Sequence, residues 1–316
     1  WSARVSPRDR AETVIENADL AMMQAKRLGR GRSSCFDLEL RAAARARANT
    51  EDALKLAIHN REISCWFQPI VQLPDGRITG FEALARWQDP RRGLISPIEF
   101  IPVAESSGLI AAIDILVMRQ ACETLAGWLH LAPPGSLHVS TNLSARSLHD
   151  HHIGDQIEAA LAEAGLDSDA LYVEITETML VDNTDSATRT MAKLRRLGVK
   201  LAIDDFGTGY SSLRYLKQFP VGFLKIDKSF TDGLGQGGHD DVIVAAVIRM
   251  ATAMGLEVIA EGVEQPEQAA LLASLGCQFA QGYLFGRPVD AAGATELLLR
   301  QQAQPTSGRR RAGRRS

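Results

Sequence analysis

Acidic and amide side chains recur at the C-terminal halves of successive predicted strands. They are Glu82, Asn142, Glu174, Glu177, Asp204, Asp205, Glu261 and Gln281, with one basic residue, Lys225, among them. Several interrupt apolar runs, as Glu82 does in Phe81-Glu82-Ala83-Leu84, so we expect the carboxylates to be largely buried. Any one of them alone is most simply explained as a solvated or ion-paired carboxylate. Burying five carboxylates close together without cations would cost on the order of several kcal/mol per carboxylate, so the set predicts a metal centre.

The candidate metal ligands all carry oxygen donors, and none is His or Cys. Such ligands select hard cations, so we expect Mg²⁺ or Mn²⁺ rather than zinc or copper. Adjacent Asp204 and Asp205 can flank two ions about 3.5–4 Å apart, the spacing of two-metal phosphodiester hydrolysis. One ion is the alternative, and two ions are the prediction. Lys225 can orient the attacking water or stabilise phosphate charge. The alternative is a structural salt bridge to one of the carboxylates, and the two roles are compatible.

A glycine-rich segment, DDFGTGYSS from Asp204 to Ser212, leads from a strand end toward a predicted helix. It lacks the Lys-Ser/Thr and the glycine spacing of a nucleotide-binding P-loop. We therefore expect its glycines to let the backbone turn sharply beside the metal site.

Short β-rich runs alternate with helix-length segments from residue 62 onward. The predicted strands are 65–73, 78–87, 138–144, 171–177, 200–206, 223–227, 257–263 and 279–285. The predicted helices are 97–131, 149–164, 184–197, 211–218, 239–254 and 265–275. This alternation is typical of a closed (β/α)8 barrel, with an open doubly wound sheet as the alternative. Residues 74–77 are too few for a crossover helix, so the first two strands should form an antiparallel hairpin. The predicted fold class is α/β, a modified TIM-like barrel with an antiparallel first strand.

Charge and composition exclude several classes of protein. Residues 49–303 hold 20 Lys and Arg against 32 Asp and Glu, a net charge of −12, which disfavours a nucleic-acid groove. No apolar run approaches the ~20 residues of a membrane span, and the N-terminus lacks the apolar region of a signal peptide, so this piece is expected in the cytoplasm. The four cysteines lie far apart with no CxxC pair, which fits neither a zinc site nor a disulfide scaffold, so we expect buried or incidental thiols.

Together the strand-end motifs resemble those of EAL-domain cyclic di-GMP phosphodiesterases, over roughly residues 55–300. The motifs, in the order of the family, are Glu82-Ala83-Leu84, Asn142-Leu143-Ser144, Glu174-Ile175-Thr176-Glu177, Asp204-Asp205-Phe206-Gly207, Lys225-Ile226-Asp227, Glu261-Gly262-Val263-Glu264 and Gln281-Gly282-Tyr283. The resemblance implies metal-dependent hydrolysis of cyclic di-GMP to linear pGpG with two Mg²⁺ or Mn²⁺ ions.

The same resemblance implies a role for each residue. The first ion would be held by Glu82, Asn142, Glu174 and Asp204, and the second by Asp204, Asp205 and Glu261. Lys225 would contact the nucleophilic water and Gln281 would help to position it, so that Lys225, Glu261, Gln281 and Glu82 form the catalytic set. Substrate contacts would come from Gln68, Arg86, Asp205 and Gln281. Glu177 would hold the glycine-rich loop rather than a metal.

The N-terminal residues resemble the last helix and final strand of a GGDEF (diguanylate cyclase) domain, through Ala18-Asp19-Leu20-Ala21 and Gly29-Arg30-Gly31-Arg32. No Gly-Gly-Asp-Glu-Phe occurs in the chain, so this piece is not expected to cyclise GTP. The resulting domain prediction is a GGDEF-like remnant over 1–45, a helical connector over 46–60, the EAL barrel over 61–302 and a disordered Arg-rich tail over 303–316. Apolar spacing predicts helices near 8–30 and 38–59.

Three functional hypotheses remain. An active phosphodiesterase is favoured because none of the strand-end residues that the family uses for metal binding and catalysis is missing. A catalytically silent cyclic di-GMP receptor usually lacks one or more of them. A nucleic-acid-binding protein has support only from the arginines of the tail, and no sequence-specific binding is expected. A homodimer is a family expectation. The input signal and the membrane association of a longer protein are left open.

Overall fold

Among the residues that the structure describes, nine strands form one sheet. The computed structural model describes residues 11–27, 29, 31–73, 75–181, 185–207, 219 and 221–303. Its strands are β1 (Ile63–Gln72), β2 (Arg77–Asp89), β3 (Gly93–Ile95), β4 (His138–Asn142), β5 (Leu171–Thr176), β6 (Lys200–Phe206), β7 (Phe223–Ile226), β8 (Glu257–Ala260) and β9 (Phe279–Gln281).

The strand pairing closes a barrel. The order around the sheet is β1-β9-β8-β7-β6-β5-β4-β2, β1 also pairs with β2, and the short β3 extends the far end of β2. Strand β2 and strands β4 through β9 form only parallel pairs with one another, whereas β1 is antiparallel to both β2 and β9, and β3 is antiparallel to β2. The predicted barrel with an antiparallel first strand is therefore confirmed, and the open-sheet alternative is excluded.

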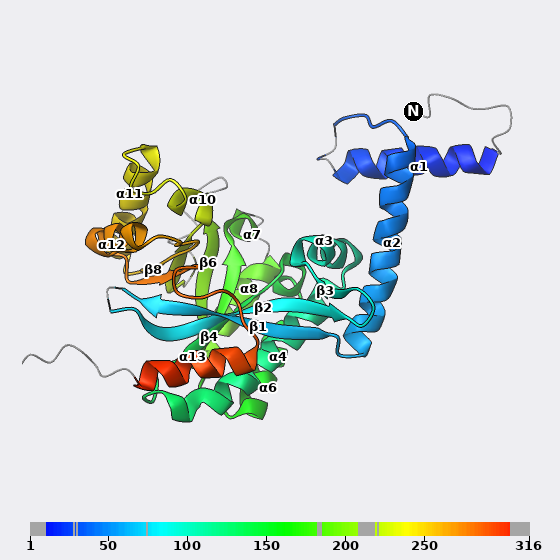
Figure 1. Cartoon of the computed structure of the whole chain (residues 1–316). Coiled ribbons are helices and arrows are strands. Elements are labelled where there is room, and N and C mark those ends of the chain that lie inside the picture. Colours follow the sequence, from blue (N-terminus) through cyan, green and yellow to red (C-terminus); the bar gives the residue numbers. More distant parts are fainter. Residues whose placement is uncertain are drawn as a thin grey trace, which may run out of the picture.

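Helices surround the barrel, and a long helix leads away from it (Figure 1). Those longer than five residues are α1 (Ala11–Arg27), α2 (Leu38–His59), α3 (Pro97–Ser107), α4 (Ile110–Trp128), α6 (Ile153–Ala164), α8 (Asp185–Leu197), α11 (His239–Ala253), α12 (Pro266–Leu275) and α13 (Ala291–Ala303). The shorter ones are α5 (Ala145–Leu148), α7 (Glu177–Val181), α10 (Lys228–Thr231) and the 3-10 turns Leu129–Leu131 and Ser168–Ala170. None of these helices, within the ranges that the structure covers, is both long and apolar enough to span a bilayer.

The two N-terminal helices lie where the sequence predicts them. Asp37 caps the start of α2 by accepting a hydrogen bond from the Leu40 amide, and α2 ends on the barrel with Leu54 and Ala57 buried in the core. Figure 1 shows α1 lying across the distal end of α2. Arg41 of α2 donates to Asn17 Oδ1 of α1 at 2.6 Å. The described residues between the two helices, 29 and 31–37, form no strand, so the implied final GGDEF strand is not seen there.

Several predicted boundaries are wrong for local reasons. The single helix predicted over 97–131 is divided, because Gly108 takes a left-handed conformation (φ 83°) that ends α3. Glu177 begins α7 instead of ending a strand. Helix α13 and strand β3 have no counterpart in the prediction. The helix predicted over 211–218 and tail residues 304–316 lie outside the described residues.

An apolar cluster fills the lower interior of the barrel. It consists of Ile70, Tyr172, Ala202, Phe223 and Ile259, with Phe279 packed against it. In the parallel strands each member has a polar site residue two positions further along, as Tyr172 has Glu174 and Phe223 has Lys225. Alternate side chains of a strand point to the same face, so the polar groups form the next layer toward the carboxyl ends. The barrel interior thus has an apolar layer, its floor, and above it a layer of polar side chains, the polar ring, which contains Glu174, Asp204, Lys225, Glu261 and Gln281.

Candidate active site

Lys225 lies at the centre of the polar ring, and its side chain is completely buried. Its Nζ lies 2.5 Å from Glu174 Oε2 and 2.7 Å from Glu261 Oε1. The same atom is 3.3 Å from Asp204 Oδ1 and 3.5 Å from Glu82 Oε2. Three carboxylates from β2, β5 and β6, with Glu261 just after β8, therefore surround one ammonium group, and the structural salt bridge considered for Lys225 exists as a four-way ion pair.

Two amide side chains link the carboxylates to one another. Asn142 Nδ2 donates to Glu82 Oε1 at 2.9 Å, and Gln281 Nε2 donates to Glu82 Oε2 at 2.6 Å. Gln281 Nε2 also lies 3.1 Å from Glu261 Oε1. Because both oxygens of Glu82 accept hydrogen bonds from protein amides, the orientation of this carboxylate is fixed.

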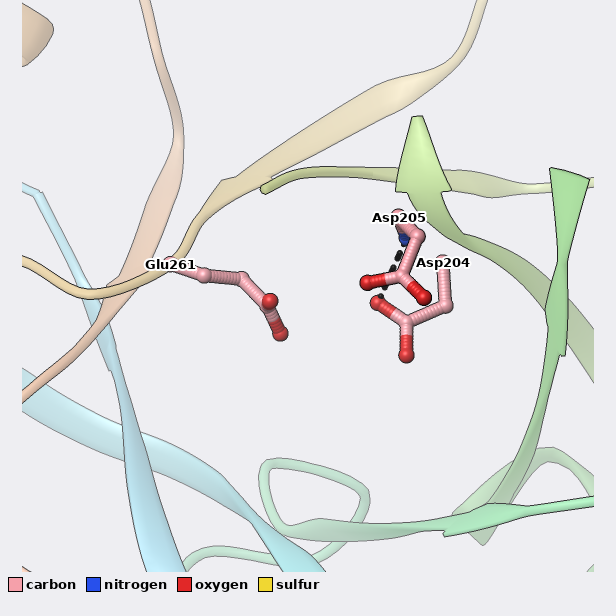
Figure 2. A group of neighbouring side chains, drawn as sticks. All are labelled: Asp204, Asp205 and Glu261. Atoms are coloured by element: carbon pink, nitrogen blue, oxygen red, sulfur yellow. Dashed lines mark hydrogen bonds between the residues drawn. The ribbon is translucent and has the colours of Figure 1, made fainter. Parts of the chain in front are cut away.

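Asp204, Asp205 and Glu261 form a carboxylate triplet at the mouth of the ring. Figure 2 shows the carboxylates of Asp204 and Asp205 side by side, with that of Glu261 pointing toward them. One oxygen from each lies within 4.8 Å of the other two. The Asp205 amide donates to Asp204 Oδ1 at 3.0 Å.

The backbone of Asp205 explains how two consecutive residues reach the same site. In a regular strand their side chains would point to opposite faces. Asp205 instead has a φ of 56°, and the pairing of β6 with β7 shifts register between Ile203 and Phe206. A left-handed residue at a bulge redirects its side chain, and Asp tolerates this conformation better than most residues. The local strain is therefore a device that brings a second carboxylate to the mouth.

Burial and charge perturb the pKa values throughout this site. Burial raises the pKa of Glu174 well above its usual value and that of Glu261 to about 8, although Lys225 opposes both shifts. Burial also raises the pKa of Glu82, but Lys225 and the two amide donors outweigh it, so the net shift is downward. Burial would lower the pKa of Lys225, yet the surrounding carboxylates raise it well above 10.5. One ammonium group does not neutralise five carboxylates, so the site favours additional positive charge.

The ring fits hard divalent cations. Glu174 Oε1 and Gln281 Oε1 are buried and accept no hydrogen bond from the residues that the structure describes. Orphaned oxygens of this kind are costly unless a cation or a water occupies the space beside them. With the triplet of Asp204, Asp205 and Glu261, the donors are all oxygen atoms, as Mg²⁺ and Mn²⁺ require.

Glu177 lies beside this set and contacts the start of the glycine-rich loop. As the first residue of α7, it accepts a hydrogen bond from the Gly207 amide at Oε2 (3.0 Å). Gly207 has a φ of 98°, and an added Cβ would lie 2.8 Å from the Phe230 ring, so only glycine fits there. The predicted turn is therefore present at Gly207, whereas residues 208–212 lie outside the described part of the chain.

The predicted substrate contacts lie on the antiparallel hairpin. Gln68 of β1 pairs in register with Glu82, and its Nε2 donates to the Gly286 carbonyl at 3.3 Å. Arg86 is half-buried on β2, with its guanidinium 5.6 Å from the centre of the Trp66 ring. Gln68 therefore lies beside the polar ring. Arg86 lies four residues after Glu82 on β2, and residues an even number apart lie on the same face of a strand.

Thr231 and Gln268 are buried residues that the sequence analysis missed, and they connect to the backbone of Glu261. Thr231, at the end of α10, donates through Oγ1 to the Glu261 carbonyl. Gln268 donates to the Thr231 carbonyl at 2.8 Å, and its Oε1 accepts from the amides of Glu264 and Gln265, each at 2.9 Å. The spacing of Gln265 and Gln268 is that of a helix capping box. This spacing is the feature of the sequence from which the role of Gln268 at the start of α12 could have been predicted.

Comparison with known proteins agrees with this geometry. The EAL domain family matches residues 51–288. The chain is 40% identical over 290 residues to the protein named cyclic di-GMP phosphodiesterase NbdA of Pseudomonas aeruginosa, covering 92% of this chain and 37% of NbdA. The chain spans about a third to a half of the length of the curated relatives it matches.

Two solved structures are similar over most of the chain. The phosphodiesterase PaMucR in complex with c-di-GMP matches with a TM-score of 0.74 and 37% identity, over 78% of this chain and 99% of that one. The EAL enzyme Bd1971, in its form bound to cAMP and cyclic di-GMP, matches with a TM-score of 0.78 and 33% identity, over 92% of this chain and 77% of that one. With the family match and the complete carboxylate ring, these findings show that the chain belongs to the EAL domain family.

Proposed function

We propose that this chain hydrolyses cyclic di-GMP to linear 5'-pGpG, as a cyclic-guanylate-specific phosphodiesterase that lowers the level of this bacterial second messenger. The observation that carries the proposal is the closure of a complete ring of carboxylates around Lys225 at the carboxyl end of the barrel. Enzymes with this fold place their active sites at that end. The name of NbdA and the ligand in the PaMucR complex support cyclic di-GMP as the substrate.

We propose two divalent cations, Mg²⁺ or Mn²⁺. Glu82, Asn142, Glu174 and Asp204 would hold one ion, and Asp204, Asp205 and Glu261 the other. When bound, such ions lower the pKa of a coordinated water and neutralise charge on the phosphate. The orphaned oxygen of Glu174 and the carboxylate triplet of Asp204, Asp205 and Glu261 support this assignment.

The side chains of the chain itself orient the reaction. Lys225 and Gln281 would hold the attacking water, whose oxygen adds to phosphorus as the P–O3′ bond breaks and a proton passes to the departing O3′. Glu82 and Glu261 would fix Gln281 through its amide nitrogen. Arg86 would bind a phosphate oxygen and Gln68 the substrate beside it, since guanidinium groups bind phosphate in two-pronged fashion. Glu177 would hold the loop at Gly207.

Metal ions would also be needed to bind the substrate. Residues 49–303 have a net charge of −12, and five carboxylates line the proposed site. A dianionic substrate would be repelled from this site in the absence of cations. Removal of metal is therefore expected to weaken substrate binding as well as turnover.

A catalytically silent cyclic di-GMP receptor is the second candidate. The test is to incubate the purified chain with cyclic di-GMP and Mg²⁺ or Mn²⁺ and to follow linear pGpG by chromatography, beside an EDTA control and a Glu82→Ala variant. Product that disappears in both controls supports hydrolysis and the assignment of the ring. Tight binding of cyclic di-GMP without product in either metal would support the receptor.

We also propose the domain order of the sequence analysis, with residues 1–45 as a GGDEF-like remnant and 46–60 as a connector. The exposed side chains of Ile15 and Met23 on α1 support packing against a further domain. We propose that the chain forms a homodimer, which light scattering coupled to gel filtration would test. A cytoplasmic location is supported by the four cysteines, all of which are free thiols.

A further inference from the structure

Asp114 is a buried carboxylate that lies outside the ring. It occupies the first half of α4, between Ile113 and Ile115, and only 7% of it is exposed. Burial raises the pKa of this carboxyl, and hydrogen bonds from Ser144 and Ser147 oppose the shift. A buried carboxylate is costly at such a position unless its hydrogen bonds are satisfied.

The partners of Asp114 lie just after the metal-ligand candidate Asn142. Asp114 Oδ2 accepts hydrogen bonds from the Ser144 amide at 2.9 Å and from Ser147 Oγ at 2.7 Å. Ser144 is the N-cap of α5, and its Oγ accepts from the Ser147 amide at 3.2 Å. One oxygen of Asp114 therefore fixes both the first turn of α5 and the residue that caps it.

The backbone between Asn142 and Ser144 is held on both sides. The Leu143 amide donates to the Glu174 carbonyl at 2.9 Å, and the next amide, that of Ser144, donates to Asp114. Asn142 is the last residue of β4, and its side chain reaches Glu82. Hydrogen bonds to β5 and to α4 therefore fix the direction of the backbone that follows Asn142.

We propose that Asp114 is a positioning residue that holds Asn142 in place for cation binding. This inference depends on the proposed function, since it concerns the proposed metal site. Asp114 acts through the backbone of Ser144 and touches neither the cation nor the substrate. Without its acceptor, the Ser144 amide and the Ser147 hydroxyl lose their buried partner, and the turn that follows Asn142 loosens.

Calorimetric titration of the metal-free chain with Mn²⁺, without substrate, tests the inference. Asp114→Leu removes the acceptor, and Asp114→Asn retains one carbonyl oxygen that can serve both donors. Loss of a group that orients a metal ligand typically lowers metal affinity 10–100-fold, so we expect about that loss for Asp114→Leu. We expect less than about threefold for Asp114→Asn, because both hydrogen bonds end on a single oxygen.

Leu298→Ala is the matched control, because Leu298 is a fully buried core residue of α13. It should lower the melting temperature and leave Mn²⁺ affinity unchanged. Wild-type affinity in a folded Asp114→Leu variant would overturn the inference, and so would an equal loss in Asp114→Asn. If Asp114→Leu does not fold, Ser147→Ala, which removes one of the two bonds, should still weaken Mn²⁺ binding, and unchanged binding would overturn the inference.

Amide hydrogen exchange of the metal-free chain distinguishes failure of this inference from failure of the proposed function. Exchange over residues 142–148 should accelerate in Asp114→Leu and remain as in wild type in Asp114→Asn. If wild type binds no Mn²⁺ but this pattern appears, the proposed function fails and the positioning of Asn142 by Asp114 stands. If exchange is unaltered in Asp114→Leu, the positioning role itself is refuted.

Discussion

Lys225 Nζ lies 2.5 Å from Glu174 Oε2, and both side chains are completely buried. The pair stands directly above the apolar floor of the barrel, where water does not screen it. Three further carboxylates approach the same ammonium group within 3.5 Å. In the metal-free chain Lys225 is therefore the main counter-charge of the ring.

Lys225→Met should destabilise the metal-free chain strongly. Removing one partner of a buried ion pair typically costs about 3–5 kcal/mol, because the other charge stays buried. Melting curves in EDTA should show this loss, and Mn²⁺ should restore much of it by replacing the missing positive charge. Lys200→Met is the control, because Lys200 is half-buried and donates to the Tyr172 hydroxyl at 3.1 Å. Equal destabilisation by both variants, or no rescue by Mn²⁺, would contradict the role of Lys225.

Asp205→Asn should separate the two proposed cation sites. Asp205 belongs to the mouth triplet and is not among the carboxylates paired with Lys225. We expect Mn²⁺ stoichiometry to fall from two to one and turnover to fall about 10²–10³-fold, the usual effect of losing one transition-state stabilising group. Calorimetry and product chromatography measure these two quantities. Two ions bound by a variant of normal activity would rule out this ligand assignment.

The predictable part of the site is the part that obeys strand alternation. Glu174 and Lys225 each occupy an interior position of a buried strand, so their convergence follows from the barrel itself. The orientation of Asp205 could not be predicted in this way, because it depends on a left-handed residue at a bulge. Asp114 was also missed, since it lies 30 residues before Ser144 within an apolar helix, and only the tertiary fold brings the two together.

Helix and strand boundaries show the same distinction. The 38–59 helix is predicted with its observed bounds, because its cap and composition are local signals. The sequence predicts Glu177 at the end of a strand because the β-rich pattern continues up to it, whereas the backbone leaves β5 at Thr176 and Glu177 begins α7. Its contact with Gly207, 30 residues away, is not visible in the local sequence.

Glu177→Met should loosen the start of the glycine-rich loop. Glu177 Oε2 accepts a hydrogen bond from the Gly207 amide at 3.0 Å. Methionine is similar in size but has no oxygen that could accept this hydrogen bond. We expect faster hydrogen exchange at Gly207 and turnover lowered about 10–100-fold, as for other groups that support a metal site indirectly. Glu177→Gln, which keeps an acceptor, is the control. Unchanged exchange at Gly207 in the methionine variant would refute the loop-holding role.

His138 should make stability depend on pH. Burial, together with the charge of Lys200, lowers the pKa of His138 to about 3, against a hydrogen bond to the Thr79 backbone. In the unfolded chain the imidazole binds a proton below about pH 6.5, but in the folded chain only near pH 3. The free energy of unfolding should therefore be fully retained above pH 6.5 and should decline as the pH falls toward 3, by at most about 1.4 kcal/mol per pH unit.

His138→Phe isolates this contribution, because an aromatic ring can keep the stacking on Tyr172, whose centroid is 4.0 Å away. Urea unfolding at pH 7 and pH 4 should show a larger loss in wild type than in the variant. Equal losses in the two proteins would mean that His138 is not the titrating group.

Metal dependence of turnover tests the central claim most directly. The chain is stripped with EDTA, freed of chelator by dialysis, and mixed with cyclic di-GMP across a series of Mn²⁺ concentrations, while linear pGpG is measured by chromatography. The account predicts no product without Mn²⁺ and a rise that saturates as two ions bind per chain. Product formed at full rate by the stripped chain, or no product at any Mn²⁺ or Mg²⁺ concentration, would contradict it.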